Sequence, residues 1–319
     1  GEAYSGLFGA IYQAQVTRVV LAEDCEIRTS YYGGGVVAYA QESEIVSCEN
    51  RASVSFEGPA GYVGGIAGYV VSTSSIDRCE NLGIVTGTVQ PSDNYASCLV
   101  YAGGIAGVNQ ESAIINSSNH AVVAVEALPE YDSCAGGIVG YNSGSSTFIA
   151  NCYNVAGVQL SGSGFAGGIL SYTDNADIRV ANCYNIGTVS GVPGKSYPVV
   201  PILSADSEDC YYLMNCVEGE GSYAGTALTV DYMKSTAFAA RLNDWSKTNN
   251  SSEIGWQTLY WKIEDAENDG YPVFTDQDPG YTGVESVASG VRIYPTTVSG
   301  ELFVCGAESP IYICNLAGH

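Results

Sequence analysis

The chain has 319 residues, and 34 acidic side chains against 11 basic ones give it a formal net charge of -23. This charge repels phosphate backbones and anionic membrane surfaces, which argues against nucleic acid as a partner. No apolar run reaches the roughly 18 residues of a membrane span, and the length suffices for a core without metals or disulfides. The 39 glycines and 24 tyrosines indicate an all-β protein of short strands and turns.

A glycine-pair motif recurs along the first two-thirds of the chain. The five clear copies are Gly34-Gly35-Val36-Val37-Ala38, Gly64-Gly65-Ile66-Ala67-Gly68, Gly103-Gly104-Ile105-Ala106-Gly107, Gly136-Gly137-Ile138-Val139-Gly140 and Gly167-Gly168-Ile169-Leu170-Ser171. Degenerate copies at 5–9 and 200–204 extend the array to about seven repeats of roughly 30 residues, a period typical of solenoids.

A second motif comes after each clear glycine pair and ends in Asn every time. Its copies are Cys48-Glu49-Asn50, Cys79-Glu80-Asn81, Ser117-Ser118-Asn119, Cys152-Tyr153-Asn154 and Cys183-Tyr184-Asn185. With a third short element such as 83–87, each repeat provides three short strands. One repeat cannot bury its own apolar face, so the pattern predicts stacked repeats in a parallel β-helix.

The repeated residues have expected places in such a coil. Glycine pairs suit tight corners or close backbone approaches, and Ile66 and its equivalents should point inward. The repeated Asn suits an inward corner, where its amide can bond the backbone and the Asn of the next coil. We expect a core ladder of these residues: Asn50, Asn81, Asn119, Asn154, Asn185, Cys48, Cys79, Cys152 and Cys183.

The alternation of GGIAG with CYN-x-G-x-V over residues 1–210 resembles the GLUG repeat family of bacterial surface proteins. Residues 211–280 resemble the region that lies C-terminal to such repeats, with Thr229 and Ser235 placed to cap short helices and Trp245, Trp256 and Trp261 nearby. We interpret this region as a C-terminal cap. Residues 281–319 are similar to part of the C-terminal sorting domain of type IX-secreted proteins, although Thr296-Thr297 replaces the usual Asn-Pro.

The cysteines favour packing over ligation, because no CxxC pair occurs and Ser117 replaces one of them. Cys210 shares the repeat position, and we expect Cys25 to belong with it. Two pairs, Cys98 with Cys134 and Cys305 with Cys314, are open to disulfide formation in an oxidising compartment.

Tyrosines cluster around the glycine pairs and the loops before them: Tyr31, Tyr32, Tyr62, Tyr69, Tyr95, Tyr101, Tyr131, Tyr141 and Tyr172. They are either good strand residues that seal the coil surface or platforms on which sugar rings stack. From this set we take Tyr62, Tyr69, Tyr95, Tyr101, Tyr131 and Tyr141 as candidate ligand-binding residues.

Other site chemistry is weakly indicated. Asp265 to Asp276 approximates a Ca²⁺ loop but deviates at two positions, so we expect no cofactor or metal and leave Ca²⁺ open. The carboxylate pairs Asp174 with Asp177 and Asp206 with Asp209 are the candidates for glycoside hydrolysis. His120 and His319 are the only histidines, which leaves no triad or zinc site.

We therefore expect a secreted or cell-surface adhesion or ligand-presenting protein that is not an enzyme, in which the solenoid provides length and the loops provide recognition. Its expected partners are host or microbial surface glycans or proteins. The alternatives are a carbohydrate-active β-helix enzyme, either hydrolase or lyase, and a passive spacer. The start at Gly1, without Met or a signal peptide, suggests a processed or engineered end.

Overall fold

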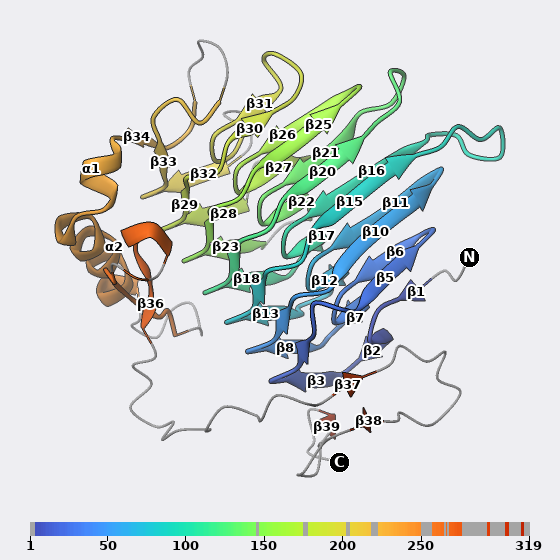
Figure 1. Cartoon of the computed structure of the whole chain (residues 1–319), viewed down its shortest axis with the longest axis horizontal. Coiled ribbons are helices and arrows are strands. Elements are labelled where there is room, and N and C mark those ends of the chain that lie inside the picture. The colour runs from blue at the N-terminus through green and yellow to red at the C-terminus, as the bar shows by residue number, and fades with distance from the viewer. Residues whose placement is uncertain are drawn as a thin grey trace.

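The structure is a computed structural model that describes residues 4–144, 147–174, 178–201, 205–217, 223–249, 257–264, 266 and 268–275, with three short strands beyond them. Within these residues the chain winds into a parallel β-solenoid of about six turns, which confirms the predicted fold class (Figure 1). No helix among the described residues is long and apolar enough to cross a membrane.

Each full coil has five strands, so the prediction of three is wrong. A coil visits five sheets in the order A, B, C, D and E, and each strand pairs in parallel with its equivalent in the next coil. Two corners divide what the sequence shows as single elements. The glycine pair separates sheet A from sheet B, and Ser47 and Cys48, with their equivalents in the other coils, separate sheet C from sheet D.

The strands follow chain order within each sheet. Sheet A contains β1 (Tyr4–Ser5), β6 (Tyr32–Gly34), β11 (Ala60–Gly64), β16 (Leu99–Gly103), β21 (Ser133–Gly136), β26 (Gly164–Gly167) and β31 (Ser196–Tyr197). Sheet B contains β2 (Phe8–Tyr12), β7 (Val37–Gln41), β12 (Ala67–Val71), β17 (Ala106–Gln110), β22 (Val139–Ser143) and β27 (Leu170–Thr173).

The other three sheets complete each coil. Sheet C contains β3 (Ala14–Thr17), β8 (Glu44–Val46), β13 (Ser75–Asp77), β18 (Ala113–Ile115), β23 (Phe148–Ala150), β28 (Ile178–Ala181) and β32 (Ala205–Glu208), with β39 (Cys314–Asn315) antiparallel to β3. Sheet D contains β4 (Val20–Leu21), β9 (Glu49–Asn50), β14 (Glu80–Asn81), β19 (Ser118–Asn119), β24 (Tyr153–Asn154), β29 (Tyr184–Asn185), β33 (Tyr211–Leu213) and β34 (Thr226–Leu228). Sheet E contains β5 (Glu26–Thr29), β10 (Ser53–Gly58), β15 (Val85–Val89), β20 (Val123–Glu126), β25 (Val158–Ser161) and β30 (Val189–Ser190).

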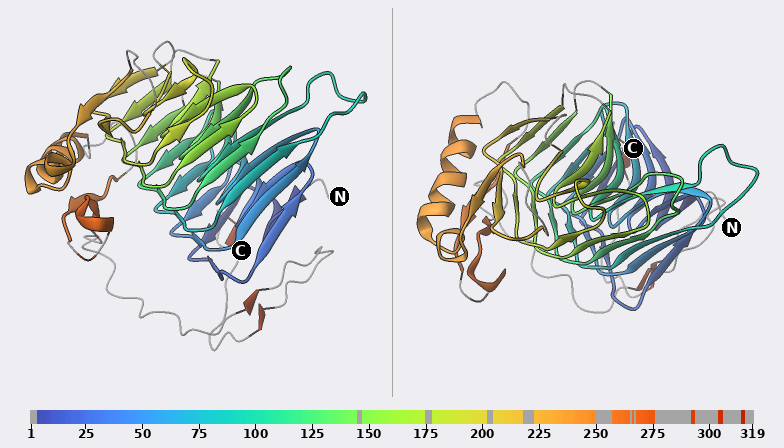
Figure 2. Two further views of the ribbon diagram at one scale, coloured as in Figure 1. Left: turned by 45° about the horizontal axis from the view of Figure 1, so that its top comes forward. Right: turned by 90° about the horizontal axis from the view of Figure 1, so that it is seen from above.

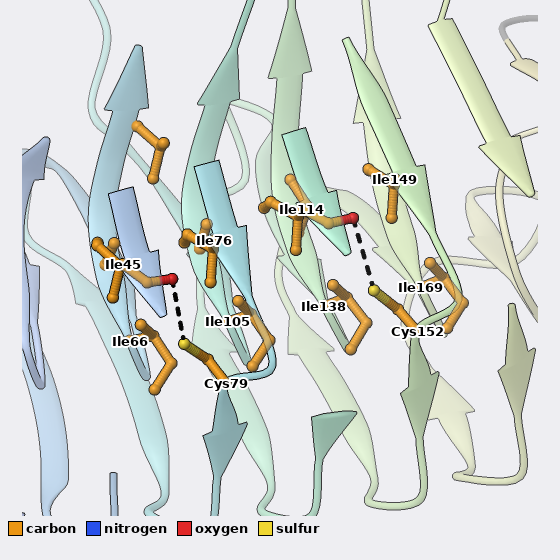
Figure 3. Packing of buried hydrophobic residues seen from close by; sticks show 14 of the residues in the cluster. Ile45, Ile66, Ile76, Cys79, Ile105, Ile114, Ile138, Ile149, Cys152 and Ile169 are labelled. Atoms are coloured by element: carbon orange, nitrogen blue, oxygen red, sulfur yellow. Dashed lines mark hydrogen bonds between the residues drawn. The ribbon is translucent and has the colours of Figure 1, made fainter. Parts of the chain in front are cut away.

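Two apolar cores run along the solenoid. Sheets B, C and D enclose one core, in which Ile45, Ile66 and Ile76 belong to ladders of buried isoleucines (Figure 3). Sheets A and E enclose the other, which is built largely from valines such as Val63 and Val85. Like residues stack in register from coil to coil, so each core is continuous and no single coil has to be stable alone.

The C-terminal region packs beside the last coils (Figure 2). It contains α1 (Val230–Met233), α2 (Thr236–Asn249), the antiparallel pair β35 (Tyr260–Lys262) and β36 (Val273–Thr275), and the 3₁₀ turn η1 (Asn268–Gly270). The Thr229 side chain accepts a hydrogen bond from the backbone N–H of Tyr232, and Ser235 accepts one from Phe238, as the capping prediction required. The remaining strands, β37 (Arg292–Ile293) and β38 (Val304–Cys305), pair antiparallel.

Candidate functional site: an aromatic stripe beside an asparagine ladder

The repeated asparagines form one buried column at the junction between the two cores. Nδ2 of Asn50 donates to Oδ1 of Asn81 at 2.8 Å, and the same bond at the same length links Asn81 to Asn119, Asn119 to Asn154 and Asn154 to Asn185. Each Nδ2 also donates to a backbone carbonyl two residues on, as from Asn81 to Gly83 at 2.9 Å. The column satisfies amides that would be costly to bury unpaired.

The second glycine of each pair is required because of this column. A Cβ on Gly65 would lie 2.3 Å from Cγ of Asn81 and 2.2 Å from the carbonyl oxygen of Gly104. Close approach, rather than a left-handed backbone, therefore explains the motif, since Gly65 and its equivalents do not have positive φ. Close approach also explains the glycine at position 68, because a Cβ there would lie 2.8 Å from the Gly33 carbonyl oxygen across the corner.

The cysteines of the second motif line the larger core. Cys48, Cys79, Cys152, Cys183 and Cys210 are all buried, and the thiol of Cys79 contacts the Ile45 carbonyl oxygen at 3.5 Å (Figure 3). Burial raises the pKa of Cys79 and Cys183 well above its ordinary value, which keeps these thiols neutral and unreactive.

Two expectations about the other cysteines need correction or comment. Val20 pairs with Glu49 and Glu26 with Ser53, so Val19 occupies the first coil's cysteine position and Cys25 does not belong to the column. Cys98 and Cys134 are separate buried thiols. The side chains of Cys305 and Cys314 lie outside the described residues, although their strands β38 and β39 pair with different partners, β37 and β3.

Tyrosines on the outer faces of sheets A and B meet across the glycine corner. On β11, Val63 points into a core while Tyr62 is half-buried on the other face, and on β12 the same alternation turns Tyr69 away from Val70. The ring centroids of Tyr62 and Tyr69 are nevertheless only 5.2 Å apart. The outer faces of the two sheets therefore face each other at this corner.

This contact repeats along the solenoid and forms what we call the aromatic stripe. Its members are Tyr4, Tyr32, Tyr62, Tyr101 and Phe165 on sheet A, and Tyr39, Tyr69, Tyr141 and Tyr172 on sheet B. Cys134 interrupts the sheet A row and Val108 the sheet B row. Because the ring centroids of Tyr101 and Tyr141 are 4.5 Å apart, the stripe stays continuous from the first coil to the sixth.

Most neighbouring rings within a row stack face to face, whereas Tyr62 and Tyr101 are tilted by 50°. Tyr4 lies 4.9 Å from Tyr32 with an interplanar angle of 8°, and Tyr141 lies 5.9 Å from Tyr172 at 14°. The exposed parts of most rings are therefore edges and hydroxyl groups. Burial raises the pKa of Tyr62 to about 12 and also raises that of Tyr32 and Tyr101, so these hydroxyls remain protonated at neutral pH.

The structure divides the candidate ligand-binding tyrosines into two groups. Tyr62, Tyr69, Tyr101 and Tyr141 belong to the stripe, whereas Tyr95 and Tyr131 enter none of its ring pairs. Tyr95 is 43% exposed on the loop between β15 and β16, and Tyr131 packs against the valine-rich core. The six candidates omitted Tyr4, Tyr32, Tyr39, Phe165 and Tyr172, of which Tyr32 and Tyr172 were among the nine clustered tyrosines. Tyr39 stands at the same place after its glycine pair as Tyr69, which was the available signal.

The candidate carboxylates and the calcium-like loop lie only partly within the described residues. Asp174 accepts a hydrogen bond from the Tyr141 hydroxyl at 2.8 Å, which places it at the stripe. Asp177, Asp265, Asp276 and the side chain of Asp206 lie outside the described residues. Where the chain is described, no three His, Cys, Asp or Glu side chains are grouped so as to hold a metal ion.

A second asparagine column, which the sequence analysis missed, attaches the C-terminal region. Asn116, Asn151 and Asn182 each precede the second motif, have positive φ, and bond one another through their side chains at 2.8 Å. Asn151 Oδ1 also accepts from Nε1 of Trp261 at 2.8 Å, and Asn182 Nδ2 donates to the Leu242 carbonyl oxygen at 3.1 Å. The recurrence of Asn in NSSN and NCYN was the signal in the sequence.

No protein-family model and no curated protein sequence matches the chain, so the resemblance to GLUG repeats remains a prediction. Among solved structures, a Bacteroides ovatus protein provisionally named immunoglobulin A1 protease is similar with a TM-score of 0.47 and 22% identity, over 82% of this chain and 75% of that one. Another, named IgA1 protease, is similar with a TM-score of 0.45 and 15% identity, over 63% of this chain and 17% of that one.

Both names belong to enzymes, so the expectation that this chain is not an enzyme is contradicted and is not carried further. The names describe the matched proteins. TM-scores below 0.5 transfer no activity to this chain.

Proposed function

We propose that this chain is an adhesion or ligand-presenting module of a secreted or surface-exposed bacterial protein, and that the aromatic stripe is its recognition surface. The observation that carries the proposal is the continuity of the stripe over six coils, on a fold whose core does not need these rings. Tyrosines offer a large, rigid, amphipathic contact area at low cost in conformational entropy, which is why they are common in binding surfaces.

Three features support this proposal. The rings are held in place before any partner arrives, because Tyr39 donates to Gln41 at 3.3 Å and Tyr141 donates to Asp174 at 2.8 Å. Such preorganisation lowers the cost of binding. The net charge of -23 keeps anionic polymers away and favours neutral or basic partners. The resemblance to GLUG repeats points to the cell surface, where glycans and proteins are the available partners.

The test is binding of the purified chain to an array of glycans and extracellular-matrix proteins. The double variant Tyr62→Ala/Tyr69→Ala removes the centre of the stripe, and Tyr95→Ala removes an exposed tyrosine outside it. We expect the double variant to lose the signals of the native chain and Tyr95→Ala to retain them, with both variants melting as cooperatively as the native chain. No signal from the native chain, or loss only in Tyr95→Ala, would contradict the proposal and favour a spacer or loop-based recognition.

A further inference from the structure

The stacking of the stripe limits the chemistry of its partner. A sugar ring binds a tyrosine through the flat face, but the faces of Tyr32 are covered by Tyr4 and Tyr62, whose centroids lie 4.9 and 5.2 Å away. Tyr4, which is 44% exposed, is the end member of its row. What the stripe offers along its length is a series of ring edges, the spaces between successive rings, and phenol hydroxyls.

We propose that the stripe binds a proline-rich polypeptide segment in the polyproline II conformation, with basic side chains next to the prolines. This inference rests on the proposed function and names the class of partner for the same surface. Polyproline II segments characteristically dock on aromatic surfaces, because they are already extended and lose little entropy on binding.

The spacing of the stripe suits such a segment. Successive coils lie about 4.8 Å apart, so two coils span about 9.6 Å, and one polyproline II turn of three residues rises about 9.3 Å. Every third residue of the peptide would then meet an equivalent position two coils further on. From Tyr4 to Tyr172 the stripe crosses six coils, or about 24 Å, which accommodates about eight residues of such a peptide.

The polar groups of the stripe are complementary to those of the peptide. A polyproline II chain has no internal hydrogen bonds, so its carbonyl oxygens need donors. The hydroxyl of Tyr101 makes no hydrogen bond within the described chain, and Tyr62 lies next to it on sheet A with a centroid distance of 5.8 Å. The Tyr101 hydroxyl can therefore donate to a carbonyl oxygen of the peptide, whereas the hydroxyls of Tyr39, Tyr69 and Tyr141 already donate to side chains of the solenoid.

The charge of the surface selects the flanking side chains. Asp174 lies beside Tyr141 at one end of the stripe. Lys195, which lies 4.8 Å from the Phe165 ring centroid at the same end, is already paired with Asp132, and the chain as a whole has 23 more acidic than basic side chains. Lysine or arginine next to the prolines would therefore be attracted, and acidic residues repelled. An anionic peptide of the same shape is not expected to bind.

The experiment titrates the whole chain with the acetylated, amidated peptide (Pro-Pro-Arg)3 by isothermal calorimetry at 0.15 M salt. The matched peptide (Gly-Gly-Arg)3 has the same charge without the polyproline II preference, and cellohexaose represents a neutral glycan. We expect the proline peptide to bind at least about tenfold more tightly than the glycine peptide. The Tyr62→Ala/Tyr69→Ala variant should lose this preference, and Tyr95→Ala should keep it.

Equal binding of the two peptides would show attraction by charge alone and would overturn the inference. Binding of cellohexaose in place of the proline peptide, or a preference for proline that survives in the double variant, would overturn it as well. If the stripe variant loses array signals while neither peptide binds, this inference fails and the proposed recognition function stands. If the array shows no signal that depends on the stripe, the proposed function fails first.

Discussion

The Cα of Gly65 stands against the side chain of Asn81, so closely that an added Cβ would lie 2.3 Å from Cγ of the asparagine. The two residues belong to different repeat motifs and different corners of the coil. The contact lies at the corner between β11 of sheet A and β12 of sheet B. Tyr62 and Tyr69, on the outer faces of these two strands, meet at the same corner.

Replacing Gly65 with alanine should destabilise the solenoid. The new Cβ would overlap both Asn81 and the Gly104 carbonyl oxygen, and overpacking of this kind costs about 1–3 kcal/mol. Gly157→Ala is the matched control, because its Cβ would meet nothing closer than Thr188 Oγ1 at 3.5 Å. Urea unfolding should show a clear loss for Gly65→Ala and a change within about 0.5 kcal/mol for Gly157→Ala. Equal losses would contradict the close-approach explanation.

Replacing Asn81 with leucine should also destabilise the protein, by about 2–4 kcal/mol. The substitution leaves the Asn50 amide and Oδ1 of Asn119 without their partners at 2.8 Å, inside a core that water does not reach. Asn94→Leu, on an exposed part of the loop between β15 and β16, is the control. A native-like unfolding midpoint for Asn81→Leu would mean that the ladder contributes nothing to stability.

The attachment of the C-terminal region can be tested with its tryptophans. Trp261→Phe removes the N–H that bonds Asn151, so α2 and β35 should lose hydrogen-exchange protection by about 1–3 kcal/mol while the solenoid strands keep theirs. Trp245 provides the comparison, because its buried Nε1 has no hydrogen-bond partner among the described residues. Trp245→Phe should cost less. Uniform loss of protection in Trp261→Phe would show that the region does not open separately.

His120 should make stability depend on pH. Burial lowers its pKa from 6.5 to about 4, although Glu80 lies 3.1 Å from its Nε2; that carboxylate is partly exposed, and its attraction is therefore screened. The unfolded chain thus binds a proton near pH 6.5 that the folded chain does not accept until near pH 4. The free energy of unfolding is therefore unaffected by the protonation of His120 above pH 6.5. It falls by up to about 3 kcal/mol as the pH drops to 4.

The variant His120→Val isolates this effect, since Val155 occupies the equivalent place in the next coil. As the pH falls from 6.5 to 4, the unfolding free energy of the native chain should decrease relative to that of the variant. Parallel stability curves over this range would contradict the assignment.

The sequence was sufficient for the solenoid itself, because Ile66 and Asn81 recur with a period that only stacked coils explain. It did not reveal the number of strands, since β9 and β14 are two residues long and their corners fall inside motifs that look continuous. The sequence also did not reveal in which direction the chain turns at the glycine corner between sheets A and B. Tyr62 and Tyr69 are seven residues apart with no periodic relation, and their contact depends on the bend between two sheets.

The attachment of the C-terminal region was missed for a related reason. Sheet D bears Glu49 and Glu80 on its outer face in the early coils but Tyr153 and Tyr184 in the later ones. These tyrosines are buried under Phe238 and Trp261. The change from Glu to Tyr marks the coils on which the C-terminal region packs. The sequence alone does not show this, because sheet D and the C-terminal region come together only in the folded chain.

The most direct test of the stripe as a recognition surface compares Tyr101→Ala with Tyr95→Ala on the array of glycans and matrix proteins. The two residues are six apart, one within the stripe and one on the neighbouring loop. With equal folding verified by circular dichroism, we predict that Tyr101→Ala weakens every signal of the native chain and that Tyr95→Ala leaves them unchanged. Retention of the signals by Tyr101→Ala, with their loss in Tyr95→Ala, would contradict the account and assign recognition to the loops.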